Sequence, residues 1–209
     1  MIEVRNLTKS FDGKTILHDV SAKFETGKTN LIIGQSGSGK TVLVKSIIGL
    51  IRPEVGEILY DGRDIMKMDS SQIKELRKEI GMLFQGSALF DSETVLGNVA
   101  FPLTMFTNMS AAEIHDRAQF CIERVNLKGA DSKYPSEISG GMQKRVAIAR
   151  AIALNPKYLF CDEPNSGLDP RTSIVIDELL SDITHEYNIT TIINTHDMNS
   201  RTSTLFVEA

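Results

Sequence analysis

Short apolar runs alternate with amphipathic segments along most of the chain. Short, largely apolar runs bounded by turn residues are typical of buried strands, and such segments occur at 29–33, 157–161 and 190–193. Apolar residues at a spacing of three and four predict amphipathic helices over 42–50, 69–80, 142–154 and 170–187. Because strands and helices alternate, the pattern predicts an α/β fold with a mostly parallel sheet covered by helices on both faces.

Two regions depart from this alternation. Residues 2–24 combine short apolar runs with the turn Asp12-Gly13, which predicts antiparallel strands at the N-terminus. Residues 90–136 are predicted to be largely helical, and Ser110 with Glu113 has the spacing of a capping box that opens one of these helices. The expected architecture is therefore a parallel core sheet with an N-terminal antiparallel β subdomain and an inserted α-helical subdomain at about 86–140.

Length and composition fit this architecture and exclude several classes of protein. The 209 residues are 41% hydrophobic and 24% charged, which is typical of a globular chain and argues against collagen, coiled coil and disorder. A net charge of −4 argues against a protein that binds nucleic acid by neutralising phosphates, so no nucleic-acid partner is expected. Cys121 and Cys161 lie in apolar surroundings and are expected to be reduced core thiols.

No targeting or membrane-spanning segment is expected. The N-terminus lacks the basic start and apolar core of a signal peptide. Residues 94–112 contain no charged side chain, but they include glycine, asparagine and proline. A membrane-spanning helix needs about 20 predominantly apolar residues. This segment is interpreted as an unusually apolar, half-buried surface.

A glycine-rich loop follows the first buried strand and opens a helix. Its sequence, Gly34-Gln35-Ser36-Gly37-Ser38-Gly39-Lys40-Thr41, fits the G-x-x-x-x-G-K-[ST] pattern of a phosphate-binding loop. The glycines let main-chain N–H groups turn toward an anion, and the N-terminus of the helix adds partial positive charge. Lys40 is expected to contact the β- and γ-phosphates, and Thr41 is expected to bind Mg²⁺.

Two acidic residues end the second buried strand. Asp162 and Glu163 directly follow Cys161, and two carboxylates at the end of an apolar strand are costly unless a cation is nearby. Bound Mg²⁺ would supply that charge. We expect Asp162 to face the metal and Glu163 to face the attacking water.

With Ser139-Gly140-Gly141 added, the chain closely resembles the ATP-binding-cassette (ABC) ATPases, which are P-loop NTPases. The resemblance extends from Ile2 to Asp197, so the chain is expected to be a single ABC ATPase domain over residues 1–209. Met142 stands where the family commonly has glutamine. After Asp197 the chain does not resemble the further strands and helices of relatives, and a truncation, a frameshift and a naturally short chain all fit this ending.

The resemblance implies a role for each matching residue. For nucleotide binding it implies Phe11 as the aromatic that stacks on adenine, the loop from Gly34 to Thr41 with Val42 after it, and the signature Ser139, Gly140 and Gly141. For metal binding it implies Thr41, Gln85 and Asp162. For catalysis it implies Lys40, Gln85, Glu163 as general base and His196 as the switch histidine. Residues 166–169 resemble the D-loop at a dimer seam.

The resemblance also implies partners. The signature serine can contact a γ-phosphate only if another copy presents it, so a head-to-tail homodimer with two ATP molecules at the interface is expected. In this family the cleft beside the Q-loop receives a helix of a multi-span membrane permease, and the uncharged, Phe- and Met-rich stretch after Gln85 suits such docking, although internal packing of the helical subdomain is the alternative. This placement implies a peripheral location on the cytoplasmic face of the inner membrane.

The stretches 82–91, 98–103 and 139–142 look most like the ATPase of the Mla/Mce lipid-trafficking systems. They imply an ATPase that energises the transport of phospholipid or another lipid, together with a lipid-binding partner. Two alternatives remain: a cell-division or signalling ATPase that acts on a membrane protein without transport, and a soluble cassette linked to nucleic acid. The acidic charge and the single cassette weigh against the second of these.

Overall fold

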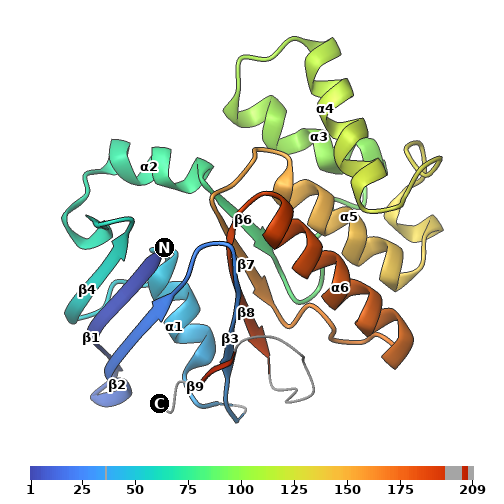
Figure 1. Ribbon diagram of the computed structural model, residues 1–209. Helices are drawn as coiled ribbons and strands as arrows, with labels where there is room; N and C mark the ends of the chain where they lie inside the picture. The colour runs from blue at the N-terminus through green and yellow to red at the C-terminus, as the bar shows by residue number, and fades with distance from the viewer. Residues whose placement is uncertain (36, 196–203, 207–209) are drawn as a thin grey trace. The chain divides into compact units, whose positions relative to one another are not determined.

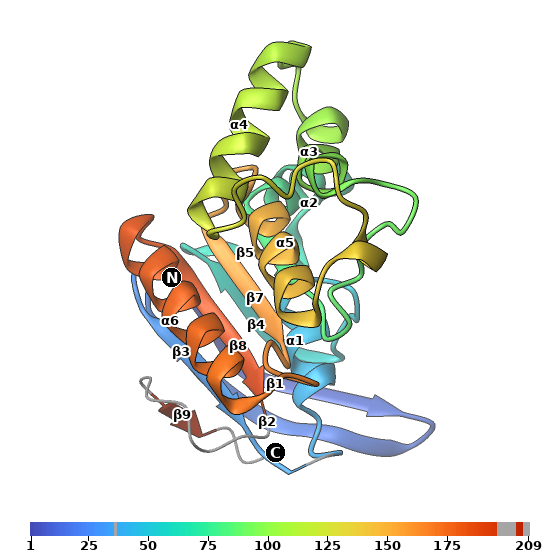
Figure 2. The ribbon, with the colours of Figure 1, turned by 90° about the vertical axis from the view of Figure 1, so that its right-hand side faces the viewer.

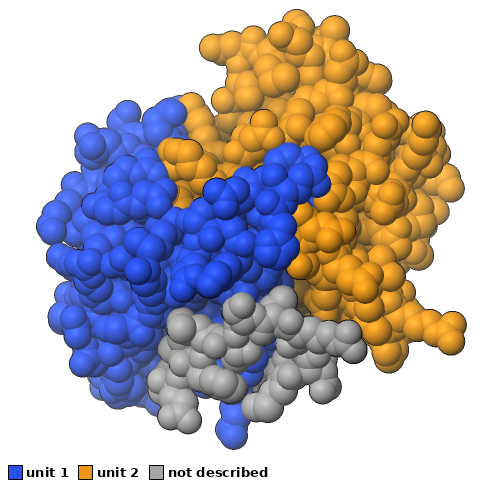
Figure 3. Space-filling model, viewed as in Figure 1, with its two compact units in different colours: residues 1–77, 183–209 blue, residues 78–182 orange. Residues whose placement is uncertain are grey.

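The computed structural model describes residues 1–35, 37–195 and 204–206 (Figure 1). The chain divides into two compact units, Met1–Arg77 with Ile183–Ala209, and Lys78–Asp182 (Figure 3). Below, they are called unit 1 and unit 2. The α/β class with parallel and antiparallel strands is confirmed, whereas the single domain with an insertion at about 86–140 stays a prediction.

Unit 1 opens with the predicted antiparallel strands. The sheet has the order β2-β1-β4-β5, formed by β1 (Ile2–Phe11), β2 (Lys14–Phe24), β4 (Val55–Tyr60) and β5 (Arg63–Asp64). Asp12 and Gly13 make the turn between β1 and β2, and both have positive φ. One face of β1 and β2 is apolar and fully buried through Ile2, Leu7, Leu17 and Phe24. The hairpin predicted from residues 2–24 is confirmed, whereas β4 and β5 have no counterpart in the sequence-based prediction.

The parallel part of unit 1 carries the glycine-rich loop. Strand β3 (Thr29–Ile33) lies between β8 (Thr190–Thr195) and β9 (Thr204–Phe206) and is parallel to both, as Figure 2 shows for β3 and β8. The loop leads from β3 into α1 (Lys40–Ile47), which packs against β2 and β8. The short helix η1 (Ile65–Lys67) follows β5, and α2 (Ser70–Lys78) ends at the start of unit 2.

The predicted extension of α1 to residue 50 is wrong. The helix ends at Ile47, and Gly49 takes a left-handed φ of 73°, which an α-helix cannot continue. Leu50, which the pattern placed on the apolar face, has 61% of its surface exposed.

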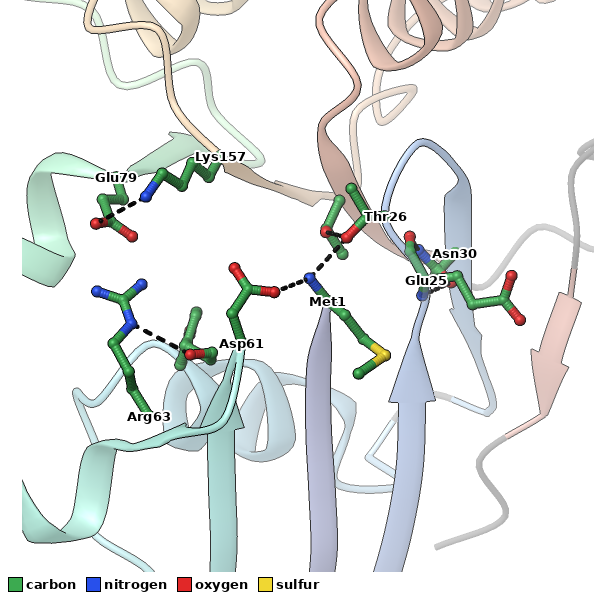
Figure 4. A network of polar contacts seen from close by, with 10 residues as sticks. Met1, Glu25, Thr26, Asn30, Asp61, Arg63, Glu79 and Lys157 are labelled. Atoms are coloured by element: carbon green, nitrogen blue, oxygen red, sulfur yellow. Dashed lines mark hydrogen bonds and ion pairs between the residues drawn. The ribbon is translucent and has the colours of Figure 1, made fainter.

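The start of β1 is tied to β8 within unit 1. Figure 4 shows the N-terminal ammonium of Met1 donating to Asp61 Oδ1 and Thr26 Oγ1, each at 2.6 Å. The hydroxyl of Thr26 in turn lies 3.1 Å from that of Thr190, at the start of β8. These contacts help to fix the antiparallel sheet against the strands that carry the glycine-rich loop.

Unit 2 contains two parallel strands and most of the helices. Strand β6 (Ile80–Leu83) pairs with β7 (Tyr158–Asp162). The helices are α3 (Val95–Phe106), α4 (Ala111–Arg124), η2 (Pro135–Glu137), α5 (Gly140–Ile152) and α6 (Pro170–Glu186), whose last turn belongs to unit 1. Helices α3, α4 and α5 pack on one another, and α5 also packs on β6. The capping box of Ser110 and Glu113 is present at the start of α4, as predicted.

The helix predicted over 69–80 is too long. Helix α2 ends at Lys78, and Ile80 begins β6 because its main chain pairs with Tyr158 of β7. Gly81 then passes so close to α5 that an added Cβ would lie 2.4 Å from the carbonyl oxygen of Ala151. A strand pairing distant in sequence therefore overrides the local helical spacing.

The helices and the two cysteines can be compared with the predictions. Among the described residues no helix combines the length and the apolarity that crossing a membrane requires. Cys121 and Cys161 are free and buried, as expected. Burial raises the pKa of Cys121 to about 11 and raises that of Cys161 further.

Candidate functional site

The glycine-rich loop is positioned by the buried strand before it and the helix after it. All five residues of β3 are buried, so the strand is a fixed anchor, and α1 begins at Lys40. The ammonium of Lys40 donates to the carbonyl oxygens of Gly34 at 2.7 Å and Gln35 at 2.9 Å. The lysine side chain thus folds back over its own loop, and its charge lies at the loop rather than in solvent.

Glycine is required at the end of this loop. Gly39, the N-cap of α1, has a left-handed φ of 91°, and an added Cβ would lie 3.1 Å from Leu17 and 3.2 Å from Ile16. A side chain at this position would therefore crowd β2, whose residues would have to shift slightly, and its positive φ would strain the main chain. Gly34 is constrained differently, because its Cβ would lie 2.7 Å from the hydroxyl of Ser38.

Two features of the loop fit a bound phosphate. The buried Oγ of Ser38 has no hydrogen-bond partner within the protein, although buried hydroxyl groups are almost always hydrogen-bonded. No side chain caps the N-terminal N–H groups of α1, and its first turn holds no acidic residue. Unpaired donors at a helix N-terminus beside a lysine form an anion-binding site. The residues present therefore fit the phosphates of a nucleotide.

The predicted adenine contact lies in the same unit as the loop. Phe11 ends β1 and has 42% of its surface exposed, with the ammonium of Lys9 4.9 Å from its ring centroid. Strand β2, which follows the turn after Phe11, provides the two residues that Gly39 packs against. The ring is therefore accessible for stacking, and its role stays a prediction. Val42 is half-buried on α1.

The acidic pair ends β7 in unit 2. Asp162 is the last residue of the strand, and Glu163 follows it with a positive φ of 48°. Both are partly buried. A left-handed glutamate is strained, and such strain is often retained at functional sites. Carboxylate, hydroxyl and amide oxygens suit Mg²⁺, so the chemistry of Asp162, Thr41 and Gln85 fits this ion.

Gln85 lies close to the loop after the acidic pair. It is exposed in the loop after β6, and its side-chain amide donates to Ser166 Oγ at 3.4 Å. Ser166 belongs to the segment 166–169 that resembles a D-loop. Unit 2 thus brings two of the predicted motifs into contact.

The signature residues form the start of α5. Ser139 is its N-cap and accepts a hydrogen bond from the N–H of Met142 at 3.3 Å. Ser139 and Gly140 are exposed, so they are accessible to a ligand presented from outside unit 2. Gly141 packs against α6, since an added Cβ would lie 2.7 Å from Thr172.

The predicted residues are distributed over both units. Phe11 and the loop from Gly34 to Thr41 belong to unit 1, while Gln85, the signature residues and the acidic pair belong to unit 2. Ser36 and His196 lie outside the described residues. Sequence reasoning missed Lys144 and Arg150, two cations of α5 that bind the loop after Gln85. The available signal was a lysine spaced by three and four from the apolar Ala147 and Ile148.

Known proteins similar to this chain identify its family. The model of the ABC transporter family matches residues 17–166. The probable ribonucleotide transport ATP-binding protein mkl of Mycobacterium leprae is 44% identical over 198 residues, which are 95% of this chain and 57% of that protein. The intermembrane phospholipid transport system ATP-binding protein MlaF of Haemophilus influenzae is 42% identical over 198 residues, 95% of this chain and 75% of that protein. The chain thus spans little more than half the length of the first of these relatives.

The fold also has solved counterparts. The dimeric post-hydrolysis state of the ATP-binding cassette MJ0796, bound to ADP and Pi, is 32% identical and superposes with a TM-score of 0.88, covering 100% of this chain and 94% of that chain. ABC ATPases bind ATP with Mg²⁺, which are the cofactors expected from the motifs. The chain belongs to the ABC transporter family and is an ATP-binding cassette of that family.

Proposed function

We propose that this chain binds ATP with Mg²⁺, hydrolyses it, and energises a membrane transporter for phospholipid or another lipid. The observation that carries the proposal is the loop of unit 1, where Lys40 and the unpartnered Ser38 hydroxyl lie at the uncapped start of α1.

Each predicted residue has a task in this reaction. Lys40 and the main-chain amides of the loop bind the β- and γ-phosphates and stabilise the charge that develops there. Glu163 orients the attacking water and accepts its proton, and Gln85 and His196 help to position that water and the γ-phosphate. Thr41 and Asp162 would hold Mg²⁺, and the ion would supply positive charge to the phosphate oxygens when bound.

The exposed signature supports a homodimer. Ser139 and Gly140 present a helix N-terminus to the outside of unit 2, where the γ-phosphate bound by another copy could reach it. ATP then joins two copies head to tail, and hydrolysis separates them. The dimeric MJ0796 cassette, which is similar over 94% of its length, supports this arrangement.

An apolar surface of unit 2 supports docking to a permease. Five large apolar side chains near Gln85 and along α3 have between 40% and 59% of their surface exposed: Phe84, Phe90, Phe101, Met105 and Phe106. Exposed apolar side chains of this size are costly in water and suit contact with an apolar helix of a partner. The partner would be a multi-span permease, which places the chain on the cytoplasmic face of the inner membrane.

The relative MlaF supports the lipid assignment. Its name places it in intermembrane phospholipid transport, and this chain matches 75% of its length. The relative mkl, which carries a probable ribonucleotide transport name, is equally similar, so identity alone does not decide the substrate. The lipid assignment therefore depends also on the stretches 82–91, 98–103 and 139–142, which look like those of Mla/Mce ATPases. It implies a lipid-binding partner.

Reconstitution with the permease tests this function. The chain is co-expressed with multi-span membrane proteins encoded beside it, and the complex that co-purifies is placed in vesicles with fluorescent phospholipid. We expect ATP-dependent phospholipid movement that Glu163→Gln abolishes. ATP hydrolysis coupled to a ribonucleotide, or to no transported molecule at all, contradicts the lipid assignment and favours a different transporter or a non-transport ATPase.

A further inference from the structure

Two cations of the signature helix bind the loop that contains Gln85. The ammonium of Lys144 donates to the carbonyl oxygen of Gln85. The guanidinium of Arg150 donates to the carbonyl oxygens of Ser87 and Ala88, each at 2.7 Å. Three of four neighbouring carbonyls, 85, 87 and 88, are therefore held by α5.

This loop has a conformation that needs external support. Ser87 and Ala88 are consecutive non-glycine residues with positive φ, 62° and 47°. Each such residue costs free energy and persists only where its surroundings enforce it. Because main-chain carbonyls are fixed by the two cations, α5 supplies that enforcement.

Lys144 is the one charged residue among the buried residues of α5. It is 4% exposed and lies on a helix whose other buried residues are apolar or small. A buried lysine pays a desolvation cost, and methionine of similar length would fill the same space without it. Burial lowers the pKa of Lys144, while the nearby Cys161, Asp162 and Glu163 oppose that shift.

The acidic neighbours also favour the charged form of the ammonium. The acidic pair at the end of β7 acts on the same charge that holds the Gln85 carbonyl. The side chain of Gln85 also contacts Ser166, three residues after Glu163. Lys144 thus holds the main chain of a residue whose side chain contacts the segment after the acidic pair, and all three belong to unit 2.

We propose that Lys144 is a positioning residue for ATP hydrolysis, whose ammonium holds the main chain at Gln85. Arg150 holds the next two carbonyls of the loop and supports its shape. The inference deepens the proposed ATPase function and rests on it. Lys144 acts through the main chain of Gln85 and is not among the residues predicted to bind the nucleotide.

The test compares Lys144→Met with Lys157→Met in the full chain. Lys157 is also in unit 2 but is exposed, in an ion pair with Glu79 at 3.3 Å, so its replacement makes the same change in charge and length without affecting the loop. For Lys144→Met we expect turnover at saturating ATP to fall roughly 10- to 100-fold, the usual effect of losing such a supporting contact. The KM for ATP should change by less than about twofold, because ground-state binding is preserved. Lys157→Met should match the unaltered chain in both.

Amide hydrogen exchange gives a readout independent of activity. Lys144→Met should accelerate exchange in residues 84–88, and Lys157→Met should not. Unaltered exchange there, or turnover equal to that of the parent chain, overturns the role of Lys144. If the parent chain does not hydrolyse ATP, the proposed ATPase function is contradicted. Hydrogen exchange still decides whether Lys144 holds the loop. Circular dichroism checks folding, and Lys144→Gln replaces Lys144→Met if the latter does not fold.

Discussion

The ammonium of Lys40 lies 2.7 Å from the carbonyl oxygen of Gly34, six residues earlier in the chain. The two residues are the ends of the loop that joins β3 to α1, so the lysine closes the loop upon itself. A triphosphate offers this ammonium stronger, charged acceptors than two neutral carbonyls. Nucleotide binding therefore requires Lys40 to leave these carbonyl oxygens and bind phosphate oxygens instead.

Lys40→Ala should remove tight nucleotide binding. A hydrogen bond to a charged group contributes about 1.5–3 kcal/mol, so ATP affinity should fall at least roughly 10- to 100-fold. Isothermal titration calorimetry measures the change, and Lys45→Ala is the matched control because that lysine is exposed on the same helix. Unchanged affinity in Lys40→Ala would remove the loop from nucleotide binding.

Ser38→Ala should separate the stability of the empty protein from its affinity for ATP. The Ser38 hydroxyl is buried without a partner, so its removal should leave the free energy of unfolding without nucleotide unchanged or up to about 1–3 kcal/mol higher. ATP affinity should fall roughly 2- to 10-fold, since one neutral hydrogen bond contributes about 0.5–1.5 kcal/mol.

Ser46→Ala is the control for that variant. The Ser46 hydroxyl already donates to the carbonyl of Val42 at 2.8 Å, so its loss should lower stability and leave ATP affinity unchanged. Urea unfolding and calorimetric titration measure the two quantities. If Ser38→Ala behaves like Ser46→Ala, the Ser38 hydroxyl is structural and does not bind phosphate.

Glu163→Gln should bind ATP normally, hydrolyse it slowly and accumulate as a dimer. Loss of a general base commonly lowers the rate about 10²- to 10⁴-fold. Steady-state phosphate release measures turnover, and light scattering with ATP measures the dimer. Glu178→Gln, on the exposed side of α6, should behave like the parent chain. Retained turnover in Glu163→Gln would exclude Glu163 as the base.

The two buried thiols predict a pH dependence of stability. Burial raises the pKa of Cys121 from its ordinary value of 9.0 to about 11. The folded state therefore holds this proton more tightly than the unfolded state, so its contribution is fully present below pH 9 and is lost as pH rises toward 11. Unfolding by urea should show a smaller loss of stability over this range in Cys121→Ala. An identical loss in both proteins contradicts the buried, protonated thiol.

The parts of the site that a short segment encodes could be predicted from the sequence. The phosphate loop is one example, because glycine spacing, the lysine and the strand before it are all local. The capping box at Ser110 is another, and both of its hydrogen bonds are present at the start of α4.

The rest depends on contacts between distant residues. Ile80 has the helical spacing of α2 but joins a strand because β7 pairs with it. In the sequence, Lys144 cannot be distinguished from other polar residues of an amphipathic helix. Its role depends on its contact with the carbonyl of Gln85, which is distant in the chain. Strand β9 consists of three residues, too few to show a pattern.

A crystal structure of Glu163→Gln grown with ATP and Mg²⁺ would locate the nucleotide. We expect the β- and γ-phosphates to contact the main-chain amides of the loop and the ammonium of Lys40, which has left the Gly34 carbonyl, while Ser139 from a second copy contacts the γ-phosphate. A nucleotide bound elsewhere, or Lys40 still bonded to Gly34 beside a loop without phosphate, would contradict this expectation.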